Sequence, residues 1–193
     1  MKKVELNDSN LIEATKRLSL SKSVQKKNLT GIKRLVSDLV LNIHANIQQW
    51  NNLNAQGLTY IKDITQKRRD KKYFLILQDL CVNLGNICNR MDNIVENLDQ
   101  IKHQLTAAKI LQKSTDKLFL TWPVTRFEEV AESIHEVYCK EAKLKRIILE
   151  NVAHKTSESW KVLFLTAWVH QPFLHDHVKL LLDVMLLEIN YKK

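Results

Sequence analysis

Three histidines, His170, His175 and His177, are the residues whose type and spacing come closest to a site for chemistry. Together with Asp176 and Cys139 they offer imidazole, carboxylate and thiolate groups, which zinc takes as ligands in proteins. A catalytic zinc needs three ligands on rigid backbone, oriented by further groups around them. A proline between the first two histidines predicts a turn there. We therefore expect these histidines to cap helix ends, and we predict no metal site.

Four glutamates, Glu128, Glu129, Glu132 and Glu136, lie close together along the chain. Paired carboxylates can carry out general acid–base catalysis. Acidic side chains near the start of a helix also stabilise its positive end, and we prefer that interpretation. The sequence contains no Walker A, GxGxxG, HExxH, CxxC or nucleophile-elbow motif. We therefore predict a protein that is not an enzyme and takes no cofactor.

The composition points to long helices with few connections. Only 3 of the 193 residues are glycine and 2 are proline. Sandwiches and barrels need a turn roughly every 8–12 residues, and dinucleotide-binding folds need clustered glycines, so both classes are excluded. The longest apolar run is far shorter than the roughly 20 residues of a membrane span, and the charged N-terminus lacks the apolar segment of a secretory signal. The three cysteines lack metal-ligand spacing, as is typical of a reduced intracellular chain.

Positive charge is concentrated in two stretches of the chain. The net charge is +9, and residues 1–34 contribute +6 of it while residues 62–72 contribute +4. We interpret residues 1–28 as a basic, mobile arm. Lys67, Arg68 and Arg69 form a basic tip that is suited to contact phosphate, although no aromatic residues lie between them for base stacking. A solvated loop is the alternative interpretation of this tip.

Two long heptad patterns are the strongest physical signal in the sequence. Between residues 32 and 64, apolar or aromatic residues fill eight of ten positions spaced alternately four and three apart; between residues 73 and 108 they fill all eleven. Such patterns predict coiled-coil helices, here about 50 and 55 Å long. Because residues 65–72 interrupt the spacing, we predict a turn and an antiparallel hairpin. Its seam can close on itself, on a second copy, or on a different coiled-coil chain.

A third helix is expected after an apolar linker. Residues 118–122 are mostly apolar and lead to Pro123, which prevents the preceding helix from running on. Thr125 and Glu128 have the spacing of a capping box, in which both side chains bind backbone N–H groups at the helix start. An apolar stripe then continues to residue 152.

Two shorter helices are expected at the C-terminal end. Ser157 or Ser159 can cap the first, which ends near Pro172 and whose apolar residues, Trp160 included, we expect to be buried. The second runs from about Leu174 to Ile189 and carries leucine around most of its circumference. A helix of that kind is normally buried on several sides.

Four short motifs stand out from the helical pattern. They are Trp50-Asn51-Asn52-Leu53-Asn54-Ala55-Gln56-Gly57, Thr121-Trp122-Pro123-Val124-Thr125, Trp168-Val169-His170-Gln171-Pro172-Phe173, and Met185-Leu186-Leu187-Glu188. In this order and spacing they resemble the cyclin-dependent kinase 2-interacting protein family over nearly all of residues 30–190. Residues 1–28 show no comparable match.

The resemblance implies a non-enzymatic adaptor found in the nucleus with a cytoplasmic pool. Its expected roles are DNA replication, damage-checkpoint signalling, and membership of an AAA+ ATPase complex in replisome protein turnover and large ribosomal subunit maturation. Cell-cycle kinases and AAA+ ATPase subunits are the partners that it implies. The sequence has no Ser-Pro or Thr-Pro dipeptide, so a link to a proline-directed kinase would be docking rather than phosphorylation of this chain.

We therefore expect an all-α protein with a basic arm at 1–28, a coiled-coil hairpin at 29–117 and a three-helix region at 118–193. Its partners would include another coiled-coil protein, or a second copy, and no membrane. The alternative is a basic helical protein that binds nucleic acid or the ribosome through phosphate. The expected partner-binding residues are Trp50, Leu53, Leu77, Leu84, Met91, Leu98, Trp122, Pro123, Trp168, His170, Gln171, Pro172 and Phe173.

Overall fold

The computed structural model describes residues 31–66, 73–112, 118–155 and 157–190. Within these ranges the chain forms helices and no strands: α2 (Ile32–Gln66), α3 (Tyr73–Leu111), α4 (Val124–Val152), α5 (Glu158–His170) and α6 (Asp176–Glu188). The prediction of an all-α protein with a long hairpin and a smaller C-terminal helical part is confirmed. The basic arm at 1–28 and the tip formed by Lys67, Arg68 and Arg69 lie outside the described residues. None of the described helices is long and apolar enough to cross a membrane.

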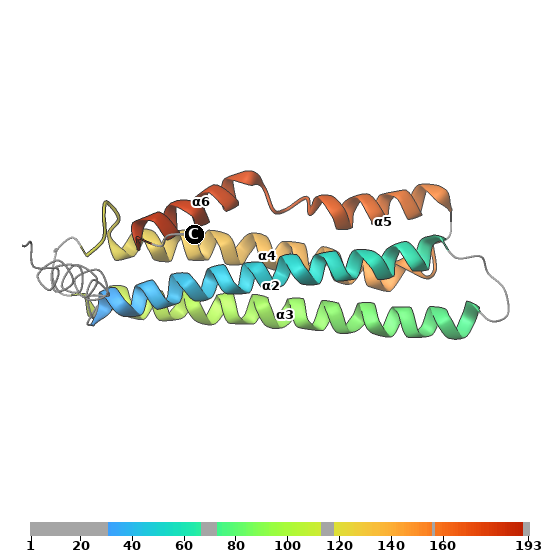
Figure 1. Ribbon diagram of the computed structural model, residues 1–193, viewed down its shortest axis with the longest axis horizontal. Helices are drawn as coiled ribbons and strands as arrows, with labels where there is room; N and C mark the ends of the chain where they lie inside the picture. Colours follow the sequence, from blue (N-terminus) through green and yellow to red (C-terminus); the bar gives the residue numbers. More distant parts are fainter. Residues whose placement is uncertain (1–30, 67–72, 113–117, 156, 191–193) are drawn as a thin grey trace, which may run out of the picture.

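The three long helices α2, α3 and α4 lie side by side; α3 runs antiparallel to α2 and α4 and packs against both (Figure 1). The heptad seam of α3 is buried between them, and Leu84, Met91 and Leu105 are fully inaccessible to solvent. The seam predicted for α2 is buried as well, including Val36, Ile43 and Trp50. The seam therefore closes within one chain, and α4 supplies its third wall. The division of the chain at residue 117 stays a prediction.

The short helices α5 and α6 lie end to end along α2 and α4, on the side away from α3 (Figure 1). Together they run antiparallel to α4 and take the place of a fourth helix of the bundle. The break between them is residues 171–175, which we call the corner. Gln171 there has a left-handed backbone conformation, with φ at 45°, and follows the last residue of α5. The helix thus ends just before Pro172, as predicted.

The predicted capping box at the start of α4 is wrong. The helix begins at Val124, the capping position is Pro123, and no side chain caps it. Thr125 therefore lies inside the first turn and is exposed. Glu128 instead accepts a hydrogen bond from Thr106 Oγ1 at 2.9 Å and pairs with Lys109, both on α3. At α5 the capping position is Ser157, as predicted, but its side chain makes no cap hydrogen bond.

The expected burial of the C-terminal helices is also wrong in part. On α5, Val162 is 60% exposed, Leu163 51% and Trp160 42%. On α6, Leu180 is 60% exposed and Leu187 63%. Each short helix packs against the bundle on one side only, because no described element covers its other side.

Candidate partner-binding surface

Two of the motifs meet where α5 ends against α2. Trp50 Nε1 donates a hydrogen bond to Gln171 Oε1 at 2.8 Å, and Trp168 Nε1 donates one to the backbone oxygen of Asn54 at 2.9 Å. Both indoles are fully buried. A buried indole N–H normally needs such a partner, and here each partner lies on the other helix or in the corner. These two hydrogen bonds fix the position of α5 on α2.

Gly57 makes this contact possible. A Cβ at this position would lie 2.2 Å from Cζ2 and 3.0 Å from Cε2 of Trp168, far inside van der Waals contact. The indole ring of Trp168 therefore packs directly on the backbone of α2. The motif from Trp50 to Gly57 thus supplies what the motif from Trp168 to Phe173 needs: an N–H donor for Gln171, a carbonyl acceptor for the Trp168 indole, and a position without a side chain for its ring.

A buried ion pair on α4, between Glu141 and Lys145, contacts both α5 and the corner. Lys145 Nζ lies 3.0 Å from Glu141 Oε1, and both side chains are inaccessible to solvent. Lys145 Nζ also donates to the backbone oxygen of Trp168 at 2.8 Å and lies 4.4 Å from the centre of its indole ring. Glu141 Oε2 accepts from the backbone N–H of Phe173 at 3.2 Å. Burial lowers the pKa of Lys145 to about 8, although the Glu141 carboxylate partly offsets that effect.

The remaining two motifs meet at the far end of α6. The carboxylate of Glu188 accepts hydrogen bonds from the backbone N–H of Thr121 at 2.8 Å, from that of Trp122 at 3.2 Å, and from the Thr121 hydroxyl. Burial raises the pKa of Glu188, but these hydrogen bonds to the charged form outweigh it and hold the pKa below its usual range. Trp122 itself packs edge-on against Phe127, with ring centres 5.3 Å apart. The four motifs thus hold α5 and α6 on the three-helix bundle.

Six of the expected partner-binding residues are buried in the core of the chain. They are Trp50, Leu53, Leu84, Met91, Leu98 and Trp168, each at most 2% exposed. We assign them to the core, because the α2–α3–α4 seam closes within the chain. Leu77 is half-buried, and Gln171 is half-buried and occupied by Trp50.

Four of the expected partner-binding residues, Pro123, His170, Pro172 and Phe173, are exposed, and Trp122 is half-buried. The three in or next to the corner adjoin the exposed side of α5 and α6. They lie within reach of a partner in the folded chain.

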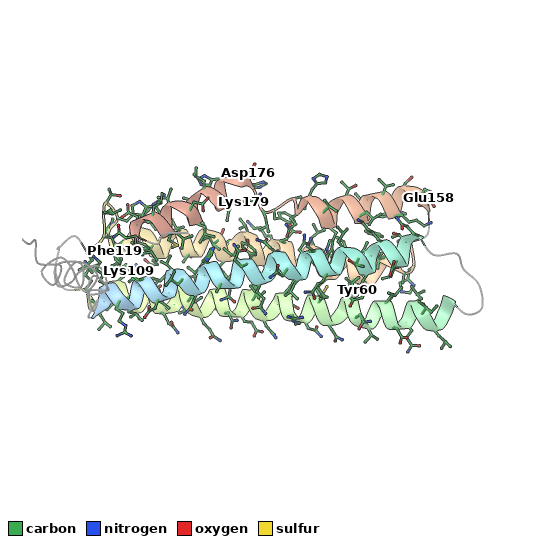
Figure 2. The ribbon with its side chains drawn as sticks, viewed as in Figure 1. Tyr60, Lys109, Phe119, Glu158, Asp176 and Lys179 are labelled. Carbon is green, nitrogen blue, oxygen red and sulfur yellow. The ribbon has the colours of Figure 1, made fainter. Side chains whose placement is uncertain are left out.

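The outward side of α5 and α6 carries large apolar side chains that nothing described covers. We call this surface the outer face and define it by Trp160, Val162, Leu163, Val169, Phe173, Leu180 and Leu187, each 39–63% exposed. The starts of the two helices, at Glu158 and Asp176, are labelled in Figure 2. Seven large apolar side chains are thus exposed along these two short helices and the corner, and exposed apolar area is what protein interaction sites use. The outer face is therefore the candidate partner-binding surface.

A groove of about 440 Å³ lies beside the corner, between α2, α4 and α6. His44, His170 and His175 line it, above a floor that includes Tyr138 and Leu182. His177 is exposed and does not line it. Within the described residues, no group of three histidine, cysteine, aspartate or glutamate side chains is placed to hold a metal ion.

The sequence held a signal for the buried ion pair that the prediction of the α4 stripe missed. Ile134, Tyr138, Glu141, Lys145 and Ile148 follow the alternating four-and-three spacing of a core stripe. All five are buried. Because two of them are charged, a stripe drawn from apolar residues alone leaves out Glu141 and Lys145.

Comparison with known proteins places the chain near one group. No protein-family model matches it. It is 39% identical over 75 residues to the human protein named cyclin-dependent kinase 2-interacting protein, which is 39% of this chain and 35% of that protein. The Xenopus laevis protein of that name is 36% identical over 74 residues, which is 38% of this chain and 36% of that protein.

The Bos taurus protein of the same name is 36% identical over 81 residues, or 42% of this chain and 38% of that protein. The matched part of the chain thus spans little more than a third of the length of these curated relatives. All of them are named as interacting proteins and not as enzymes. Over about two fifths of its length, this chain is similar to cyclin-dependent kinase 2-interacting protein, which confirms the resemblance to that family over a shorter stretch than the expected residues 30–190.

Proposed function

We propose that the chain is a non-enzymatic, cell-cycle-related adaptor and that it docks a cyclin-dependent kinase through the outer face of α5 and α6. The name of its relatives supplies the kinase as the partner to test. The exposed apolar side chains of the outer face support it as the docking surface. Docking agrees with the lack of Ser-Pro and Thr-Pro sites in the sequence, because a docked kinase need not phosphorylate the chain.

The observation that carries this proposal is the contrast between the two sides of α5. Its inward side is fixed by Trp168 and by the Lys145 hydrogen bond, so the helix is held in place. Its outward side exposes Val162 and Leu163 by more than half. Burying the exposed half of such a side chain against a partner contributes roughly 1–2 kcal/mol, and a helix that is already formed loses less entropy on binding than a disordered segment.

The finer roles rest on the resemblance alone. The partners are AAA+ ATPase subunits and another coiled-coil protein. The roles are DNA replication, checkpoint signalling, replisome protein turnover and large ribosomal subunit maturation. The location is the nucleus, with a cytoplasmic pool. A homodimer and contact with ribosomal phosphate through the basic stretches are further proposals. Purification of the tagged chain from cells at high salt, with partners identified, tests these roles together.

The docking proposal is tested with purified chain and purified cyclin-dependent kinase 2 bound to cyclin. Affinity is measured for the wild type and for Val162→Glu with Leu163→Glu. We expect the double variant to lose at least about tenfold in affinity, because two apolar contacts become charged ones. The matched control is Val82→Glu, since Val82 is 56% exposed on α3, far from the outer face.

Two results would contradict the proposal. One is a folded double variant that binds the kinase as tightly as the wild type; the other is a wild type that does not bind at all. Salt dependence separates the apolar surface from the basic stretches, since phosphate-driven or ionic binding weakens steeply between 0.1 and about 0.5 M salt and apolar binding does not.

A further inference from the structure

The helices α5 and α6 are short, and α5 buries two residues on the bundle where α6 buries five. Each has 13 residues. Isolated helices of that length are marginal in water, so their stability depends on tertiary contacts. Along α5 only Phe164 and Trp168 are buried, whereas eleven residues are buried along α4. Segments with few buried contacts open locally at a lower free energy than the whole domain.

The Glu141–Lys145 pair reaches both sides of the corner from α4. Lys145 Nζ donates to the backbone oxygen of Trp168, in the last turn of α5, where carbonyl groups lack helical partners. Glu141 accepts from the backbone N–H of Phe173, beyond that helix. Lys145 therefore binds α5 and Glu141 binds the corner, and the two charged groups form an ion pair with each other. Within the described residues, no other side chain of α4 makes a hydrogen bond to α5 or the corner.

We propose that α5, the corner and α6 form a strap that opens from the three-helix bundle as one unit, and that the Glu141–Lys145 pair is its latch. The other titratable side chains near the pair are Cys88 on α3 and Tyr138 on α4, and both are buried. A closed latch fixes Val169 and Phe173 on the outer face. An open one uncovers Trp50 and the backbone at Gly57 on α2, which Trp168 and Gln171 otherwise cover.

The test is amide hydrogen exchange of the full chain, followed by mass spectrometry in peptides. In Lys145→Met, the Glu141 carboxylate is left buried without its partner, which strongly favours opening. We expect exchange across residues 158–188 to become faster by on the order of a hundredfold. Exchange in the middle of α3, from Leu84 to Leu98, should stay within about twofold of the wild type because a local opening leaves the bundle folded.

The matched control is Arg146→Met, one residue further along α4. Arg146 Nε donates to Asp92 Oδ2 on α3 at 2.8 Å, so this variant loses a charged contact that does not involve the strap. We expect no selective acceleration of residues 158–188 in this control. Acceleration there equal to that in Lys145→Met would overturn the assignment of the latch.

A second variant keeps the test decisive if Lys145→Met fails to fold. Glu141→Gln with Lys145→Met removes both charges, so no unpaired charge stays buried. Trp168 still loses the donor to its backbone oxygen, and we expect about tenfold faster exchange confined to residues 158–188. Unchanged exchange, or equal acceleration in the strap and in α3, overturns the proposal. No partner is needed, so this result is independent of whether the kinase binds.

Discussion

We expect Gly57→Ala to lower the free energy of unfolding, which is the opposite of the usual effect of replacing a helical glycine by alanine. Replacing a helical glycine by alanine normally stabilises a protein by about 0.5–1 kcal/mol. At Gly57 the new methyl group would lie 2.2 Å from Cζ2 of Trp168, where ordinary contacts are 3.4–4 Å. The indole ring must therefore retreat by more than about 1 Å. It is fully buried, and its N–H is bonded to Asn54, so it has no free space to enter.

The expected cost of Gly57→Ala follows from three contributions. Overpacking a core costs about 1–3 kcal/mol and a lost Trp168–Asn54 hydrogen bond about 1 kcal/mol, while helix propensity returns about 1 kcal/mol. We expect the free energy of unfolding to fall by about 1–3 kcal/mol. The midpoint of urea unfolding, followed by tryptophan fluorescence, should then decrease by about 0.5–1 M.

Gly85→Ala is the matched control for that experiment. Gly85 also lies inside a long helix, but the nearest atom to a new Cβ is Leu149 Cδ2, at an ordinary 3.9 Å. We expect this variant to gain about 0.5–1 kcal/mol of stability. The reasoning is refuted if Gly57→Ala is as stable as the wild type or if the two variants shift the midpoint in the same direction.

Two further predictions concern charged groups that hold the C-terminal helices. Glu188→Ala removes the acceptor for Thr121 and Trp122, and we expect a loss of about 1.5–3 kcal/mol in urea unfolding. Because the pKa of Glu188 is lowered on folding, its contribution should fade as the pH falls below about 4.5, so the stability difference between wild type and variant should shrink there; a difference that does not change with pH contradicts this. The pKa of Lys145 is lowered from 10.5 to about 8, so unfolding takes up a proton and stability should rise by on the order of 1 kcal/mol from pH 8 to 9. Burial raises the pKa of Cys88 from 9.0 to about 11, so unfolding releases that proton above pH 9 and largely cancels the effect of Lys145 there; Lys145→Met should abolish the rise between pH 8 and 9.

The sequence by itself determined the helices and the buried sides of the longest ones. A heptad pattern is local information, because apolar residues spaced three and four apart lie on one side of a helix whatever packs there. The seams of α2 and α3 were predictable for that reason, and so were the breaks before Val124 and after His170. The exposed corner residues next to α5, among them Phe173, were also identified as accessible from their position in a turn.

Only the tertiary structure decided what covers each side. Within the described residues the seam of α2 and α3 closes on α4, so Leu84 and Met91 are core residues. Leu180 and Leu187 are exposed because no described element packs against that side of α6. Leucine residues tend to be buried, but whether a given leucine is buried depends on which element packs against it. In this chain the described elements are too few to cover every apolar helix side.

The pairing of the four motifs was likewise beyond the sequence. Trp50 and Gln171 are 121 residues apart, and Trp168 and Asn54 are 114 apart. A hydrogen bond or the gap over Gly57 depends on positions to within a fraction of an ångström, and those positions are set only when three helices have packed. For the same reason the Glu141–Lys145 pair appears in the sequence as ordinary surface charge, and only the packing of α5 against α4 makes it a buried contact.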